Sequence, residues 1–119
     1  TARAKTPPVN LRKVDLEGVR AEIEALRGKV VVLDVWATWC RPCMESWPKM
    51  LGLAEESGEA GVSFVTLSVD APKNSGLVGE FLREHGAPGK SLILDVEEYN
   101  QFVEQMGRQW EGGVPAVFI

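Results

Sequence analysis

A seven-residue run, Val30–Trp36, is apolar at every position except Asp34, and few folds can accommodate such a run. A strand with one buried and one solvated face would carry polar residues at alternate positions. A run that is apolar at successive positions is typical of a strand covered on both faces, as in a parallel sheet between helices. The sequence therefore predicts a central buried strand that carries one acidic side chain.

The rest of the chain alternates between helical and strand patterns. Helical spacing of apolar residues predicts helices at residues 16–27, 42–57, 75–85 and 97–110, and apolar runs predict further strands at residues 62–69, 92–94 and 116–119. This alternation predicts an α/β fold with a largely parallel sheet. A chain of 119 residues is the size of one domain, so we expect residues 1–119 to form a single one. Because the chain stops inside the last predicted strand, we expect a further strand and helix in the natural protein.

Composition narrows the classes of partner. The chain has 13 basic and 17 acidic residues, a net charge of −4, and its charges are interspersed. This balance argues against nucleic acid as a partner, because phosphate binding needs clustered positive charge. No apolar run reaches the roughly 20 residues needed to span a bilayer, and no signal peptide is recognisable. We expect any membrane anchor to lie in a segment outside this sequence.

The two cysteines, Cys40 and Cys43, lie in one motif. They close too small a loop to stabilise the fold much, so their role is reactivity or metal binding. Cys40 follows the central strand and precedes a helix with Pro42 in its first turn, where free N–H groups and the helix dipole stabilise a thiolate. Arg41 adds a nearby positive charge. Cys40 is therefore the predicted attacking thiolate and Cys43 the resolving thiol.

Other interpretations of the cysteine pair exist. One is an inert buried pair, which is disfavoured because thiols at a helix start become reactive. A structural zinc site needs four ligands, and the only histidine, His85, is distant in sequence. A copper-binding or metallochaperone module could use the same two thiols, and a non-catalytic interaction domain would not need them. No nucleotide or flavin fingerprint is present, so no cofactor is expected.

Two further residues are candidates for the same site. Asp34 lies six residues before Cys40, and burial should raise its pKa, so that it could exchange a proton with Cys43. The alternative is an acid satisfied by hydrogen bonds or at a strand end. Pro115 begins the last predicted strand, which alone fits an edge or first-strand residue. A cis Val114–Pro115 bond would expose the Val114 backbone to an extended substrate peptide.

These residues resemble the thioredoxin superfamily, particularly its extracytoplasmic TlpA/ResA-like branch. The resemblance covers residues 10–119, and its most specific part is Trp-Ala-Thr-Trp-Cys-Arg-Pro-Cys at 36–43. Residues 28–33, Pro48 and the Val114-Pro115 pair also match. The resemblance implies a three-layer thioredoxin fold, with a central mixed sheet and helices on both faces. It also implies a thiol-disulfide oxidoreductase that acts on protein disulfides.

The resemblance also implies roles for individual residues. Cys40 is the nucleophile, Cys43 the resolving thiol, and Asp34 the buried acid of the catalytic set. Pro48 matches the proline that kinks the active-site helix. Trp39 matches an aromatic residue packed against the disulfide, and Pro115 matches the cis-proline beside the cysteines. The implied substrate-binding residues are Trp39, Arg41, Pro42, Val114 and Pro115.

For the biology, the resemblance implies a bacterial periplasmic or other extracytoplasmic location and an upstream protein dithiol as electron donor. Reduction of apocytochrome c thiols is the usual task of the branch. The chain departs from the branch at Ser46, where many members carry Glu, and at Asp34, which is the choice of thioredoxin itself. We expect a reductant, although related dithiols span about −270 to −120 mV and include disulfide-forming oxidants.

Overall fold

Five strands form one sheet in the order β1-β4-β3-β2-β5. The structure, a computed structural model, describes residues 10–107 and 109–119. Strands β1 to β4 run parallel to their neighbours, whereas β5 pairs antiparallel with β2. The sheet is therefore mixed, as predicted, and the central strand β2 is flanked on both sides. The strands span Leu11–Val14 (β1), Val30–Trp36 (β2), Val62–Ser68 (β3), Lys90–Leu94 (β4) and Ala116–Phe118 (β5).

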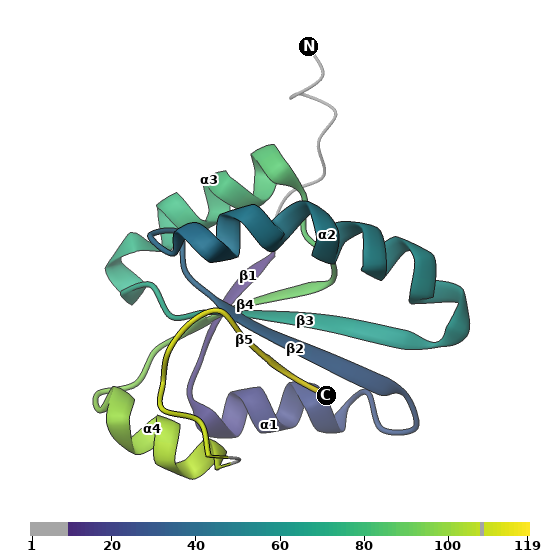
Figure 1. Cartoon of the computed structure of the whole chain (residues 1–119). Helices are drawn as coiled ribbons and strands as arrows, with labels where there is room; N and C mark the ends of the chain where they lie inside the picture. Colours follow the sequence, from purple (N-terminus) through teal and green to yellow (C-terminus); the bar gives the residue numbers. More distant parts are fainter. Residues whose placement is uncertain (1–9, 108) are drawn as a thin grey trace.

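Helices cover both faces of this sheet. Figure 1 shows α2 and α3 on one face and α1 and α4 on the other, which gives the three predicted layers. Of the described helices, none is long and apolar enough to cross a membrane. The helices span Leu16–Glu24 (α1), Arg41–Ser57 (α2), Ser75–His85 (α3) and Tyr99–Met106 (α4), with short 3-10 helices at Gly58–Ala60 (η2) and Pro72–Asn74 (η3).

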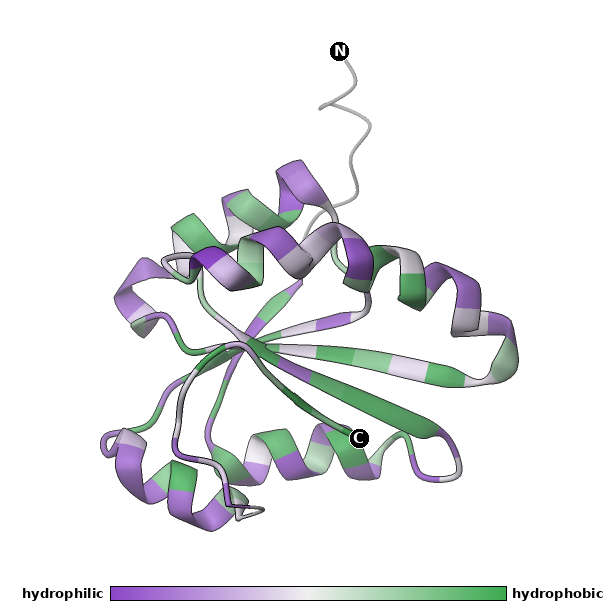
Figure 2. Ribbon diagram, in the orientation of Figure 1, coloured by the Kyte–Doolittle hydropathy of each residue, from purple (hydrophilic) through white to green (hydrophobic). Residues whose placement is uncertain are grey.

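The buried apolar residues form one cluster on each face of the sheet. Successive residues of β2 point to opposite faces, so Leu33 and Val35 pack with α1 and α4, whereas Trp36 packs with α2 and α3. Figure 2 shows this arrangement as largely hydrophobic central strands between helices that carry both polar and hydrophobic residues. We call the second group the cysteine cluster; its buried members are Trp36, Ala37, Cys40, Cys43, Trp47, Val78, Leu82 and Ile93.

The observed elements differ from the predicted ones chiefly at β1, α1 and α4. Strand β1 was not predicted, because a four-residue edge strand with two charged residues carries little pattern of its own. Helix α1 ends at Glu24 instead of residue 27, since residues 26–29 form tighter turns. Helix α4 covers Tyr99–Met106 instead of residues 97–110, because Gly107 leaves the helical conformation with φ 69°.

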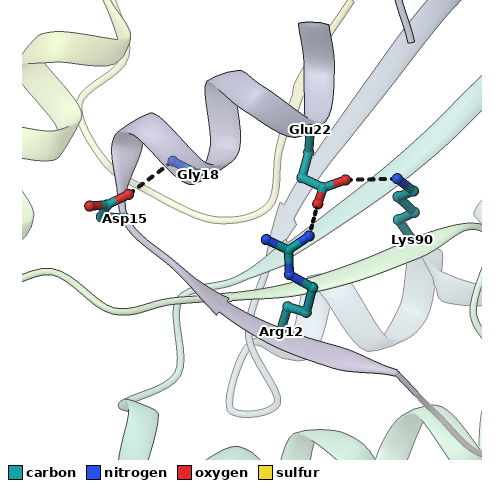
Figure 3. A network of polar contacts seen from close by, with 5 residues as sticks. All are labelled: Arg12, Asp15, Gly18, Glu22 and Lys90. Atoms are coloured by element: carbon teal, nitrogen blue, oxygen red, sulfur yellow. Dashed lines mark hydrogen bonds and ion pairs between the residues drawn. The ribbon is translucent and has the colours of Figure 1, made fainter. Parts of the chain in front are cut away.

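A buried carboxylate on α1 is paired with basic side chains of two neighbouring strands, β1 and β4 (Figure 3). Glu22 on α1 is 7% exposed and forms ion pairs with Arg12 on β1 and with Lys90 on β4, the latter at 2.8 Å. The hydrogen bond from Lys90 is the main reason that the pKa of Glu22 is lowered from its usual value. At the start of the helix, Asp15 accepts a 2.9 Å hydrogen bond from the Gly18 amide. These contacts fix α1 against the edge of the sheet.

Candidate active site

The cysteine pair lies where β2 leads into α2. Cys40 is the N-cap residue of α2, its Sγ accepts a 3.2 Å hydrogen bond from the Cys43 amide, and the two cysteines are joined in a disulfide. Cys40 is 4% and Cys43 1% exposed. The first sulfur therefore occupies the place where unpaired helix N–H groups stabilise negative charge, as the sequence predicted for a reactive thiol.

Aromatic side chains pack in the same cluster as the two cysteines. Trp36 and Trp47 are both buried members of the cysteine cluster, and their ring centroids are 4.5 Å apart. Phe81 on α3 packs against both rings at 5.2 Å. Trp39, in contrast, is 68% exposed. Two tryptophans are thus placed to report on the state of the cysteine pair, and a third lies at the surface.

Asp34 is buried in the centre of the sheet. It lies in β2 between Thr66 of β3 and Val117 of β5, and the side-chain alternation of the strand places it on the face of Trp36 and the cysteine cluster. Burial raises its pKa from 3.8 to about 6. Its carboxyl can therefore gain or lose a proton near neutral pH, which a proton-transfer group requires.

The residues predicted to meet a substrate come from two segments. Arg41 and Pro42 are exposed in the first turn of α2. Val114 lies far along the chain, yet it packs against the cysteine cluster. The Val114–Pro115 peptide bond is cis, and Pro115 is exposed. The fold therefore brings the start of α2 and the segment before β5 together at one site.

Two hydrogen bonds fix the segment that leads to this bond. The hydroxyl of Tyr99 on α4 donates to the Gly112 carbonyl at 2.7 Å. The indole N–H of Trp110 donates to the Gly113 carbonyl at 2.9 Å. Gly112 has a φ of 93°, a conformation that favours glycine. The segment that carries Val114 is thus held by α4 and by its own side chains.

The residues that follow Cys43 in α2, including Glu45 and Ser46, place no buried carboxylate beside the cysteine pair. The hydroxyl of Ser46 donates to the Cys43 carbonyl at 3.2 Å, and Glu45 is exposed. Pro48 lies inside α2. Over residues 10–107 and 109–119, no three His, Cys, Asp or Glu side chains form a group that could hold a metal ion.

One polar group beside the cysteine pair was missed in the sequence. Asp70 follows β3, is 2% exposed, and accepts hydrogen bonds from both the amide and the hydroxyl of Thr38, two residues before Cys40. Its place was a usable signal, because the carboxyl ends of neighbouring parallel strands meet at one edge of a sheet. Asp70 directly follows the strand predicted at residues 62–69, and an acidic residue at that position is the signal that identifies it.

The fold, with a cysteine pair at the start of α2, defines a thioredoxin-like protein. The chain belongs to the Redoxin family, whose sequence profile matches residues 1–119. Two solved structures share the fold at 80% coverage of this chain. They are a thiol:disulfide interchange protein of the thioredoxin family from Chlorobium tepidum TLS (TM-score 0.64, 22% identity, 63% of that chain) and a thioredoxin-related protein from Neisseria meningitidis serogroup B (TM-score 0.65, 23% identity, 67% of that chain).

Curated relatives show the same similarity in sequence. The thiol-disulfide oxidoreductase ResA of Bacillus thuringiensis (strain Al Hakam) is 38% identical over 77 residues, which make up 65% of this chain and 43% of the relative. ResA of Bacillus subtilis (strain 168) is 35% identical over 83 residues, 70% of this chain and 45% of the relative. The chain thus spans less than half the length of these relatives.

Proposed function

We propose that the protein is a thiol-disulfide oxidoreductase that reduces disulfides in partner proteins. The observation that carries this proposal is the position of Cys40, whose sulfur caps α2 and is bonded to Cys43 one helical turn further on. A thiolate at that position is stabilised by the helix N-terminus, and its partner sulfur is within bonding reach. The relatives named thiol-disulfide oxidoreductase support the same chemistry.

The reaction is a pair of thiol-disulfide exchanges that starts from the reduced protein. The Cys40 thiolate attacks one sulfur of the partner disulfide, forms a mixed disulfide and releases the other partner sulfur as a thiolate. Cys43, as thiolate, then attacks the Cys40 sulfur, which releases the second partner thiolate and leaves the Cys40–Cys43 disulfide. The partner gains two electrons, and an upstream protein dithiol restores the pair.

Two further roles, proton transfer and substrate contact, fall to Asp34 and to the residues around Cys40. Cys43 is 1% exposed, so water reaches its thiol poorly, and Asp34 would accept the thiol proton as Cys43 becomes nucleophilic. The raised pKa of about 6 suits a group that takes up this proton and later returns it. The substrate would contact the surface around Cys40, which is formed by the exposed residues Trp39, Arg41, Pro42 and Pro115 and by the half-buried Val114.

The setting of the reaction is also a proposal. The similarity to ResA proteins supports an extracytoplasmic, bacterial location, protein substrates and a protein electron donor. Ser46 stands where many members of the TlpA/ResA-like branch carry an acid, and Asp34 supplies an acid from β2 instead. We therefore propose general reduction of protein disulfides ahead of a task confined to cytochrome c maturation.

A redox titration tests the direction of the reaction. The protein is equilibrated in defined dithiol/disulfide buffers, and tryptophan fluorescence follows the state of the cysteine pair beside Trp36 and Trp47. We expect a single two-electron transition toward the thioredoxin end, at about −270 mV. A transition at about −120 mV would reverse the direction to disulfide formation. The Cys40→Ser variant, which cannot form the disulfide, is the control and should show no transition.

Trapping the mixed disulfide tests the division of labour between the cysteines. The Cys43→Ser variant should form a stable covalent complex with a protein disulfide, because the resolving thiol is missing. The Cys40→Ser variant should form much less, since Cys43 is almost fully buried. Mass spectrometry of non-reduced complexes identifies the bonded cysteine. Equal trapping by both variants, or trapping through Cys43 alone, would contradict the assigned roles.

A further inference from the structure

Asp70 makes an unusual set of contacts for a carboxylate. Its Oδ2 accepts a 3.0 Å hydrogen bond from the Thr38 amide and a 2.6 Å hydrogen bond from the Ser68 hydroxyl, while its Oδ1 accepts from the Thr38 hydroxyl. The Asp70 amide in turn donates to the Ser68 hydroxyl at 3.1 Å. None of the ion pairs among the described residues includes Asp70. Neutral donors therefore hold a carboxylate that is only 2% exposed.

The carboxylate does not serve the elements that follow it in the chain. Helix η3 begins two residues after Asp70, and neither η3 nor α3 has a side-chain hydrogen bond at its N-cap. Both oxygens instead point back to Thr38, which lies 32 residues earlier. Burying a carboxylate without a cation costs free energy, whereas an apolar residue would pack there without that cost. The hydrogen bonds from Thr38 are the interactions that distinguish a carboxylate from an apolar residue at this position.

Thr38 belongs to the turn that presents the reactive sulfur. The Cys40 amide donates to the Ala37 carbonyl at 3.2 Å, which closes the turn between β2 and α2. At its start, the Val69 amide donates to the Trp36 carbonyl at 2.8 Å and continues the sheet. Beyond that bond, the two hydrogen bonds of Thr38 to Asp70 join the middle of the turn to the end of β3. Trp39 and Cys40 follow directly.

We propose that Asp70 is a positioning residue, which clamps Thr38 so that the turn holds the Cys40 sulfur at the N-terminus of α2 and ready for attack. The inference rests on the proposed function for its biological meaning, but the attack of a thiolate on a disulfide can be measured without a protein substrate. A displacement of reacting atoms by about 1 Å can cost up to 100-fold in rate. Loss of the clamp should therefore slow the attack by Cys40.

Asparagine and alanine at position 70 separate geometry from charge. Asp70→Asn keeps an oxygen that can accept from the Thr38 and Ser68 donors, and its NH₂ group can donate to the Thr38 hydroxyl, which also accepts. Asp70→Ala removes every side-chain contact. Thr38→Ser keeps the hydroxyl, and Thr38→Val replaces it with a methyl group of similar size. The matched stability control is Asp15→Ala, which removes a helix cap on the other face of the sheet.

The first readout is the stopped-flow rate at which each reduced protein attacks an aromatic disulfide that releases a coloured thiolate. We expect Asp70→Ala to be slower than wild type by about tenfold. Asp70→Asn and Thr38→Ser should stay within about twofold, and Thr38→Val should lose about threefold. The second readout is hydrogen exchange of the Thr38 amide, which should lose protection in Asp70→Ala and keep it in Asp70→Asn. The melting temperature of each variant is measured in parallel.

Any of the following results would overturn the proposal that Asp70 positions Cys40 through Thr38. Asp70→Ala within twofold of wild type would show that the contacts do not position Cys40. Asp70→Asn as slow as Asp70→Ala would assign the effect to charge, and an equal loss in Asp15→Ala would assign it to stability. If Asp70→Ala does not fold, the Thr38→Val and Thr38→Ser pair decides. Turnover of a protein disulfide by wild type is measured separately, so failure of the proposed function would show there and not in the attack rate.

Discussion

Asp34 and Asp70 are both buried, and their different surroundings give them different properties. The carboxylate of Asp70 is fully engaged with donors from Thr38 and Ser68. Asp34 lies in the middle of β2, and burial alone is the cause of its raised pKa. A charged form that is penalised in the folded state makes the free energy of unfolding depend on pH. Asp34 should therefore leave a measurable signature in stability.

Asp34→Asn is expected to stabilise the oxidised protein at neutral and alkaline pH. The folded pKa of Asp34, about 6, lies above the usual value of 3.8, so the folded state binds its proton more tightly than the unfolded state. The wild type should lose stability as pH rises between these values, by at most about 3 kcal/mol at 1.36 kcal/mol per pKa unit. Urea unfolding at about pH 8 should show a gain of roughly 2 kcal/mol in the variant, which disappears below about pH 4.

The control for this prediction is an exposed aspartate. Asp95 is exposed at the end of β4, and Asp95→Asn should change the free energy of unfolding by less than about 0.5 kcal/mol at either pH. A pH-independent gain in Asp34→Asn would contradict the prediction, because it would show that charge burial is not the cause. A loss of stability at alkaline pH would contradict it more strongly.

At the scale of elements, one glycine allows β4 to pair with β3. Residues 86–91, Gly-Ala-Pro-Gly-Lys-Ser, end like a phosphate-binding loop, but the stretch leads into strand β4, which begins at Lys90, and not into a helix. A Cβ atom on Gly89 would lie 2.0 Å from the backbone oxygen of Phe64, which is far inside contact distance. This close backbone approach, and not phosphate binding, is the structural reason for glycine at this position.

Gly89→Ala is therefore expected to destabilise the protein by at least about 2 kcal/mol, since overpacking forces backbone shifts. Gly52→Ala provides the matched control, because Gly52 lies inside α2 and a Cβ there meets nothing within 4 Å. That change should stabilise the protein by about 0.5–1 kcal/mol, through helix propensity. Urea unfolding of both variants is the measurement. Equal effects at the two positions would show that the approach of Gly89 to Phe64 is not tight.

The Glu22 ion pairs give a second prediction for the elements. Glu22→Gln should lower the free energy of unfolding by about 1 kcal/mol at neutral pH, because a largely buried carboxylate loses its bonds with Lys90 and Arg12. The pKa of Glu22 is lowered in the folded state, so its contribution is present above its usual pKa and is lost as pH falls through the folded value. The difference between wild type and variant should therefore shrink on acidification.

The exposed pair of Glu17 and Arg20 is the control for this effect. Their side chains are 76% and 57% exposed, and surface pairs contribute little. Glu17→Gln should change the free energy of unfolding by less than about 0.5 kcal/mol. If both glutamine variants behave alike, burial of Glu22 does not strengthen its ion pairs, and α1 is held by its apolar residues alone.

At the scale of the whole molecule, local patterns predicted the elements and the cysteine pair, whereas long-range contacts had to come from the structure. The bounds of β2 and α3 agree with the sequence patterns because their residues are apolar at strand or helix spacing. Strand β1 exists through its pairing with β4, in which Leu11 meets Ser91. The contact of Asp70 with Thr38 likewise depends on which strands are neighbours. No local pattern encodes either pairing.

If the protein is a reductase, its free energy of unfolding should differ between the oxidised and the reduced form in a predictable direction. The disulfide and the dithiol can form in the folded or in the unfolded chain, which closes a thermodynamic cycle. A potential of the folded protein below that of the unfolded chain means that folding favours the disulfide, and the reverse holds for an oxidant such as DsbA, whose reduced form is stabilised. The difference follows ΔG = −nFΔE, and 30 mV corresponds to about 1.4 kcal/mol.

We therefore expect the oxidised protein to be more stable than the reduced protein. The difference in free energy of unfolding should be about 3 kcal/mol for each 60 mV by which the potential of the folded protein lies below that of the unfolded chain. Urea unfolding with and without a dithiol reductant measures both values, and Cys40→Ser, which should not respond to the reductant, is the control. A reduced form that is the more stable of the two would assign the protein to disulfide formation. Because this measurement needs no substrate, it determines the thermodynamic direction of the cysteine pair before any partner protein is known.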